Sequence, residues 1–389
     1  MHINLSTKQD LLNLIDMAGE QYNLLKTEKE RVAMLNYIGH LYQGLNFIDD
    51  EVISFSLKKL AGGHKGEAHF LTKHNALFNR WCKNFVFNKS FHNEYIGECL
   101  DACEEIYDQV IDEARSYESE HFTKDDYWEI FFEFTKSLGQ TKEFDRYIKN
   151  GNIFDTINGF KNNFLGMTSV NPKDGISSIF LDNFSYDLST MITNAHEFGH
   201  CVDFGMIFDH GSINTFNKLD YYSVYDEAIS RLYEKLLLSF LNKNNIMIYG
   251  VRDKFYDMVD LHHDYLLTVL LFTFLDDNYL VHENYKKLAS DEFYDLVKEY
   301  IPNSVGIDSF IEEGEMDLFC DTSYAYGGII ASFLQHDINE YGEFNSPLMR
   351  NFLSTRADFF DRNFIEENDL SPKKYRKIYQ KELDLMKNV

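Results

Sequence analysis

The pentapeptide His196-Glu197-Phe198-Gly199-His200 constrains the fold more than any other stretch of the chain. Residues four apart on an α-helix project from nearly the same face, so both imidazoles can bind one metal ion if this stretch is helical. Glu197 lies about 100° around such a helix from His196, which puts its carboxylate beside the metal and not on it. This arrangement is typical of a zinc hydrolase in which the carboxylate takes a proton from the water that the metal activates.

The flanking residues predict the helix that this motif needs. Asp187 can cap the start of the helix and Gly205 can end it. Between them, apolar residues recur at spacings of three and four, at Leu188, Met191, Ile192, Ala195, Phe198 and Val202. The alternative is that two core histidines fall four apart by chance, and a third candidate ligand argues against it.

A second predicted helix, residues 225–238, supplies the third protein ligand that a catalytic zinc site requires. Its inward positions are Ile229, Leu232, Leu236 and Leu237. Glu227, Ser230 and Glu234 share a stripe of this helix. Glu227 follows His200 by 227 − 200 = 27 positions, enough for a loop and a returning helix. The alternative for Glu227 is an exposed acid at a helix start.

The metal motif followed by this E-A-x-S-x-x-x-E helix resembles the thimet oligopeptidase and oligopeptidase F group of zinc metallopeptidases. Residues 178–184 are similar to the strand that precedes the metal helix in that group, where the strand edge pairs with an extended peptide substrate. Alternating Ile179, Leu181 and Asn183 suit that use. The likeness covers about residues 160–240, and a weaker stretch follows near 317–334.

The resemblance implies a role for each matching residue. The zinc ligands would be His196, His200 and Glu227. Glu197 would be the general base that later returns its proton to the leaving amine. Ser230 and Glu234 would orient the ligands.

Tyr324 and Tyr326 are both candidates for the tyrosine that donates a hydrogen bond to the oxyanion in this group. The group usually carries a histidine shortly before these tyrosines, but residues 317–323 contain none. This departure affects the predicted stabilisation of the transition state and leaves the predicted metal ligands unchanged.

The charge balance restricts the partners. The chain carries 63 Asp and Glu against 37 Lys and Arg, a net charge of −26, which argues against nucleic acid or an anionic membrane and favours neutral or basic peptides. The longest apolar run, 266–275, is too short to cross a bilayer. The sequence does not define an oligomeric state.

Cysteine use and the N-terminus predict a cytoplasmic location. Five cysteines without a CxxC pair imply no disulfide framework and fit a reducing compartment. The first residues lack the basic start and apolar block of a secretory signal.

The predicted fold is mainly α-helical, with two helical lobes around a substrate groove and a small β-sheet next to the metal helix. We expect residues 1–150 to form a helical N-terminal lobe, whose first helix Ser6 caps, and residues 151–389 to form the catalytic region, both within one intimate unit. Further helices are expected over 57–60, 102–114, 127–138, 253–277, 291–300, 332–339 and 372–387.

The expected function is that of a zinc-dependent metalloendopeptidase acting on short oligopeptides. One alternative is a substrate-selective, protein-processing or toxin-like metalloprotease with a wider groove. Another is a zinc carboxypeptidase, which would trim ends. A catalytically inactive zinc-binding relative is the non-enzymatic alternative, although a structural zinc site has no use for Glu197.

Overall fold

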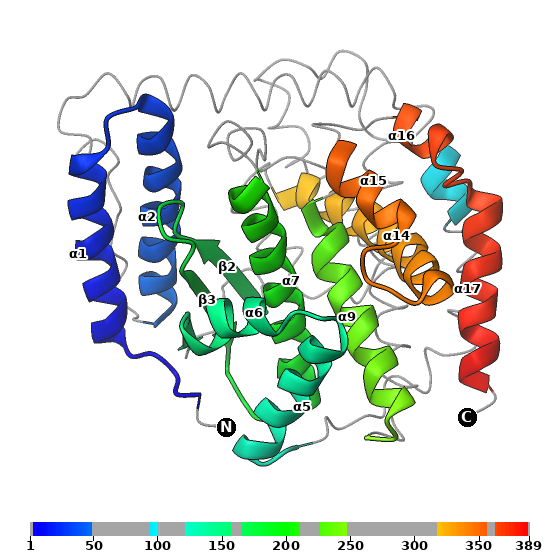
Figure 1. The fold of residues 1–389 in the computed structure, drawn as a ribbon, viewed down its shortest axis with the longest axis horizontal. Coiled ribbons are helices and arrows are strands. Elements are labelled where there is room, and N and C mark those ends of the chain that lie inside the picture. The colour runs from blue at the N-terminus through cyan, green and yellow to red at the C-terminus, as the bar shows by residue number, and fades with distance from the viewer. Residues whose placement is uncertain are drawn as a thin grey trace, which may run out of the picture. The chain divides into compact units, whose positions relative to one another are not determined.

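The computed structural model describes residues 3–48, 94–99, 101, 121–156, 165–210, 226–246, 317–355 and 362–387 (Figure 1). The chain forms two compact units, Met1–Leu77 with Ser119–Asp220, and Phe78–Glu118 with Tyr221–Val389. Helices dominate, and three strands form one small sheet, so the predicted mainly α fold is confirmed. The division near residue 150 and the substrate groove stay predictions. The apolar run 266–275 and the helices expected over 57–60, 102–114, 253–277 and 291–300 lie outside the described residues.

The first unit begins with a pair of packed helices, α1 (Lys8–Leu24) and α2 (Glu28–Ile48). Thr7, not Ser6, caps α1: its hydroxyl accepts a hydrogen bond from the backbone N–H of Asp10, and its own N–H donates to the Asp10 carboxylate at 2.7 Å. Ser6 instead donates its backbone N–H to the carbonyl of Ile153 in the sheet, at 2.7 Å. Thr7 is the residue with an acidic partner three positions ahead, which a reciprocal cap requires.

The sheet contains β1 (Asn152–Thr156), β2 (Gly166–Val170) and β3 (Ser177–Asp182), in the order β1-β3-β2. The strand expected over 178–184 is β3, but the edge that the resemblance assigns to a peptide substrate is not available. Strand β3 pairs in parallel with β1 and antiparallel with β2, so both of its edges are occupied. Within the described residues, the outer edge of β2 has no strand beside it.

Helices cover both faces of the sheet. Helix α2 packs against β1 and β2 on one side, and α7 (Leu188–His210) packs against β2 and β3 on the other. Helix α2 comes so close that a Cβ on Gly44 would lie 2.2 Å from the Phe180 ring. Because both faces are covered, β3 is buried from Ser177 to Leu181 and does not alternate between polar and apolar residues.

Helix α5 (Lys124–Ser137) supports α7 with aromatic side chains, and α6 (Thr141–Phe144) and the π-helix η1 (Asp145–Lys149) follow it. Thr123 caps α5. The helix expected over 127–138 is therefore confirmed, and it starts three residues earlier. Phe131 of α5 and Tyr147 of η1 contact Phe198 edge to face, with ring centroids 5.8 Å and 6.4 Å away.

Helix α7 begins as predicted but does not end at Gly205. Asp187 caps it, because the backbone N–H of Thr190 donates to the Asp187 carboxylate at 2.8 Å. The helix continues to His210. A Cβ at residue 205 would lie 1.7 Å from the hydroxyl oxygen of Tyr147, so Gly205 provides space for that tyrosine and does not terminate the helix.

The described elements of the second unit include α9 (Asp226–Lys243), α14 (Asp317–Tyr341), α15 (Pro347–Thr355), α16 (Arg362–Glu367) and α17 (Pro372–Lys387). The bounds of α17 match the prediction, and the helix expected over 332–339 lies within α14. Helices α9 and α14 pack together, and the Gln335 amide of α14 donates to the Lys235 carbonyl of α9 at 3.0 Å. The predicted inward residues of α9 are buried, namely Ile229, Leu232, Leu236 and Leu237. Within the described ranges, no helix combines the length and apolar composition that a bilayer span requires.

Candidate metal centre

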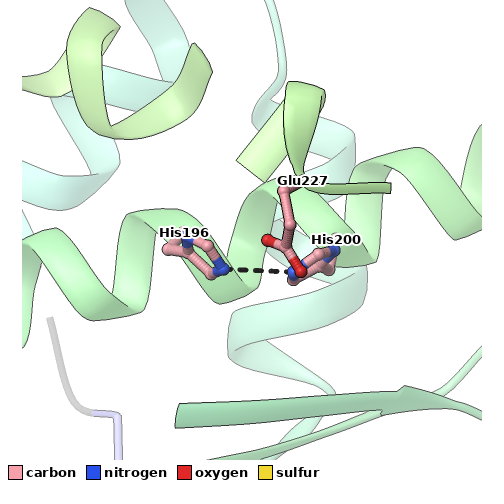
Figure 2. A group of neighbouring side chains, drawn as sticks. All are labelled: His196, His200 and Glu227. Carbon is pink, nitrogen blue, oxygen red and sulfur yellow. Dashed lines mark hydrogen bonds between the residues drawn. The ribbon is translucent and has the colours of Figure 1, made fainter. Parts of the chain in front are cut away.

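The two motif histidines lie one turn apart on α7 with their rings turned toward each other (Figure 2). His196 is buried and His200 is half-buried. Their Nε2 atoms are 3.1 Å apart, and the ring centroids are separated by 4.8 Å at an interplanar angle of 76°. The helix therefore brings the same nitrogen of each imidazole to one point.

This spacing fits a single metal ion. Two nitrogens bound to one tetrahedral zinc at ordinary bond lengths lie about 3.4 Å apart, close to the observed separation of the Nε2 atoms. Ligand atoms of His196, His200 and Glu227 all lie within 4.8 Å of one another, so the group could hold a metal ion. Two imidazoles and one carboxylate are also the donor set of several catalytic zinc sites, which keep a fourth position for water.

Glu197 lies outside this donor group and is 3 % exposed. Strand β2 touches it in two places. The Thr168 hydroxyl donates to the Glu197 backbone carbonyl at 3.1 Å, and the Cα of Gly166 faces the carboxylate. The sheet therefore supports the helix at the candidate general base.

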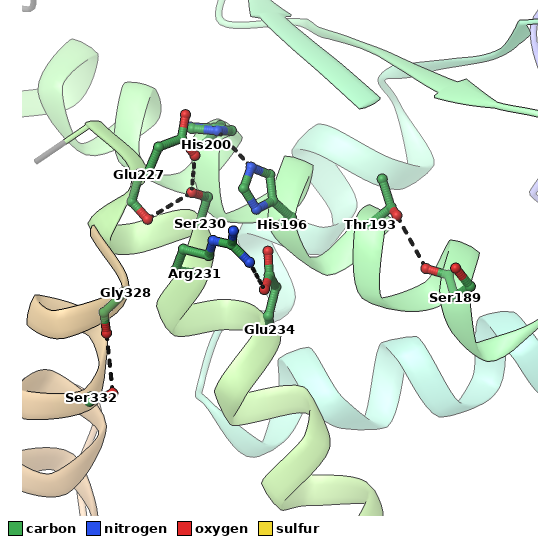
Figure 3. Close-up of polar contacts among 10 residues, drawn as sticks. All are labelled: Ser189, Thr193, His196, His200, Glu227, Ser230, Arg231, Glu234, Gly328 and Ser332. Atoms are coloured by element: carbon green, nitrogen blue, oxygen red, sulfur yellow. Dashed lines mark hydrogen bonds and ion pairs between the residues drawn. The ribbon is translucent and has the colours of Figure 1, made fainter. Parts of the chain in front are cut away.

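Glu227 is oriented by its own helix. The Ser230 hydroxyl lies 2.9 Å from a carboxylate oxygen of Glu227 and 2.9 Å from its backbone carbonyl, and can donate to either (Figure 3). This contact is the one that the resemblance implies for Ser230. Glu234 accepts a hydrogen bond from Arg231 at 3.2 Å, and this ion pair is largely shielded from water, with side chains 9% and 11% exposed.

Tyr324 and Tyr326 both lie on α14, so the tyrosine-rich segment is helical. The Arg231 guanidinium lies over the Tyr324 ring, 5.0 Å from its centroid. Tyr326 is completely buried and stacks on Tyr95 with ring centroids 5.8 Å apart. Residues two apart on a helix project about 200° apart, so the two hydroxyls cannot serve one site together.

Next to the metal motif, Cys201 is a buried free thiol. Burial raises the pKa of this thiol well above its ordinary value, and the nearby Glu197 carboxylate raises it further. The thiol therefore stays protonated in this environment.

Sequence reasoning missed Gly166, Thr168 and Gly327. A Cβ on Gly327 would lie 2.7 Å from the Cβ of Glu227. These contacts join residues far apart in the chain, so the spacing of residues along a helix or strand does not predict them. For Gly166 the available signal was a glycine inside a β-like run, which often marks a close approach of another group.

No protein-family model matches the sequence, and no curated protein matches it. Among solved structures, the chain is similar to one described as a "putative peptidase from Chlamydophila abortus", with 14% sequence identity and a TM-score of 0.49. The match covers 95% of this chain and 63% of that chain, so this chain spans less than two thirds of the other protein's length. Neither family nor activity follows from a likeness at this level, and the thimet oligopeptidase resemblance stays a prediction.

Proposed function

We propose that this protein is a zinc-dependent metallopeptidase that hydrolyses internal bonds of short peptides. The observation that carries the proposal is a donor group of two histidines and a carboxylate with a separate buried carboxylate, Glu197, on the same helix as the histidines. A structural zinc site needs only ligands, whereas a hydrolytic site also needs a base. His196, His200 and Glu227 would hold the zinc.

In this proposal zinc, when bound, supplies a Lewis acid that lowers the pKa of water and polarises the scissile carbonyl. Glu197 accepts the proton of the attacking water and returns it to the leaving amine. Its burial limits the number of positions that its carboxylate can take. Ser230 keeps the Glu227 carboxylate in one orientation.

Tyr324 is the better candidate for an oxyanion donor. Tyr326 is wholly buried and stacked on Tyr95, whereas Tyr324 is only partly buried. A donor must reach the substrate oxygen, so a tyrosine that is not fully buried suits the role. The Arg231 guanidinium over the Tyr324 ring would restrict the motion of that ring.

An extended substrate would pair with β2 and not with β3. The outer edge of β2 carries no strand within the described residues, and the first residue of β2, Gly166, faces Glu197. Backbone hydrogen bonds along such an edge hold a peptide with little regard to its sequence. The acidic chain would favour neutral or basic peptides, and we propose a cytoplasmic location.

The test is to purify the chain, quantify its bound metal, and incubate it with a library of short peptides read by mass spectrometry. We expect one zinc per chain and internal cleavage that a chelator abolishes. Glu197→Gln should keep the zinc and lose about 10²–10⁴-fold in turnover, the range for removal of a general base. Glu133→Gln, which alters an exposed carboxylate on α5, is the matched control and should behave as wild type.

Three results would count against the proposal. Cleavage by Glu197→Gln at the wild-type rate would remove the proposed mechanism. Trimming from the chain ends alone would indicate a carboxypeptidase. Bound zinc without cleavage of any peptide would favour a protein-selective protease, or an inactive relative if folded proteins are not cut either.

A further inference from the structure

Two glycines lie against the two glutamates on which the proposed function depends. A Cβ at residue 166 would lie 2.4 Å from Oε1 of Glu197 and 2.9 Å from its Cγ and Cδ. A Cβ at residue 327 would lie 2.7 Å from the Cβ of Glu227 and 2.8 Å from its carbonyl carbon. Real Cβ atoms essentially never approach other atoms so closely. We propose that Gly166 and Gly327 are positioning residues, which set the places of the Glu197 and Glu227 carboxylates by having no side chain.

The requirement at both positions is for space. Neither Gly166 nor Gly327 has a positive φ, so an alanine could adopt the backbone conformation of either. Gly19 on α1 is a useful contrast, because a Cβ there would meet nothing within 4 Å. Conformational freedom therefore does not explain these two glycines, whereas the close approach of Glu197 and Glu227 does.

At Gly166 the contact is with the end of a side chain. Alternate residues of a strand face the same side, so Gly166 and Thr168 both face α7. Thr168 fixes the backbone of Glu197 through its hydrogen bond to the carbonyl, and Gly166 leaves room for the carboxylate. A methyl group at residue 166 would leave the helix in place and push the carboxylate aside. The expected defect is a misplaced base with the histidines undisturbed.

At Gly327 the contact is with the start of a side chain and with the backbone. Helix α14 packs on α9 at this point, and the atoms nearest to a new Cβ include the carbonyl carbon and oxygen of Glu227. Backbone atoms cannot rotate away, so α9 itself would have to move. The expected defect is a displaced metal ligand. The two glycines therefore predict different measurable losses.

The catalytic part of this inference rests on the proposed function, but the steric part does not. We first measure Tm in the metal-free protein for Gly166→Ala, Glu197→Ala and the double variant. Gly166→Ala should lower Tm by several degrees when Glu197 is present, and by less than half as much when Glu197→Ala has removed the crowded atoms. Equal shifts in both backgrounds would overturn the steric contact.

The second measurement separates catalysis from metal binding. Gly166→Ala should lower kcat by about 10²-fold, the loss expected from a displacement of about 1 Å. Its zinc Kd and its KM should stay within about twofold of the wild-type values. A kcat within twofold of wild type would overturn a positioning role for Gly166. Gly19→Ala should change none of these quantities.

For Gly327→Ala we expect the zinc Kd to rise by about 10–100-fold, as for loss of a group that orients a ligand. A Co²⁺ absorption spectrum that differs from the wild-type spectrum would report the displaced ligand without any turnover. An unchanged Kd and spectrum would overturn the inference. If this variant does not fold whereas Gly19→Ala folds normally, the loss of folded protein supports the contact, because no side-chain movement can relieve the overlap with the Glu227 backbone. A folded variant with the wild-type Tm overturns it.

Failure of the proposed function would be distinguishable from failure of this inference. A wild-type protein that binds zinc but cleaves nothing would end the peptidase proposal. The coupling of Tm between Gly166 and Glu197 and the zinc Kd of Gly327→Ala would still test whether the glycines hold the carboxylates in place.

Discussion

Helices α7 and α9 both carry candidate metal ligands, but different contacts hold them. Helix α7 lies on a sheet whose far face is covered by α2, and β2 touches Glu197 through Gly166 and Thr168. Helix α9 packs on another helix, α14, and Glu227 is oriented by Ser230 from its own helix. The candidate ligands on α7 are supported by a layered sheet in the first unit, and the candidate ligand on α9 is supported by close helix packing in the second. Changes that test the two kinds of support should therefore have different consequences.

The largest effect should follow removal of a ligand from either helix. His200→Ala and Glu227→Ala should each weaken zinc binding by roughly 10²–10³-fold. This range assumes that a binding free energy of about 10–16 kcal/mol is shared equally among the three protein ligands and one water. His336→Ala, which changes a histidine on α14 that pairs with Glu340, is the control and should bind normally. Zinc affinity can be measured by competition with a chelating dye. Full affinity in Glu227→Ala would restrict the metal site to α7.

Gly205→Ala should give the next largest effect, on stability and not on chemistry. The new Cβ would overlap the Tyr147 hydroxyl, and overpacking of this kind costs about 3 kcal/mol in the free energy of unfolding. Urea unfolding of the metal-free protein measures it. Tyr147→Phe removes the overlapping oxygen, so the double variant should recover part of the loss. No recovery would mean that α7 does not depend on this contact.

Acid should weaken the sheet that supports α7. The Nδ1 atom of His40 on α2 lies 3.1 Å from the Ser169 hydroxyl on β2, and burial lowers the pKa of His40 to about 4. The unfolded chain binds a proton at its ordinary pKa of about 6.5, so the contribution to stability is complete above that pH and is lost as pH falls toward 4. We expect the free energy of unfolding to fall by roughly 2 kcal/mol. This is less than the pKa shift of His40 alone implies, because the His40 side chain is half-buried and water screens part of the effect.

The check is urea unfolding of wild type and His40→Gln at pH 7.5 and pH 4.5. The wild type should lose more stability than the variant over this interval. An equal loss in both proteins would show that other groups cause the acid sensitivity.

The smallest effect should come from Ser230→Ala. Loss of its hydrogen bond to Glu227 should raise the zinc Kd by about tenfold, the lower end for a group that orients a ligand. Ser332→Ala is a matched control, because that buried serine donates to a carbonyl of its own helix and contacts no candidate ligand among the bonds drawn in Figure 3. Equal affinities for the two variants would contradict a role for Ser230.

The sequence by itself determined the features that depend on local periodicity. Spacing of four on a helix puts His196 and His200 on one face, and the cap at Asp187 and the inward face of α9 follow from residues within a few positions of one another. Spacing along α9 also puts Ser230 one turn from Glu227, where its hydroxyl reaches the carboxylate.

Only the tertiary structure decided which strand edges are paired among the described residues and why particular glycines are present. Ser178 and its neighbours predict a strand, but strand order depends on pairing with β1 and β2, which no local pattern encodes. Glycine is typical of a helix end, but Gly205 lies within α7 and leaves space for the Tyr147 hydroxyl. Gly166 and Gly327 acquire their importance from Glu197 and Glu227, which the folded chain brings against them. The sequence shows that a glycine gives the backbone more conformational freedom. It does not show which neighbouring group occupies the space left by the missing side chain, because that neighbour is known only in the folded structure.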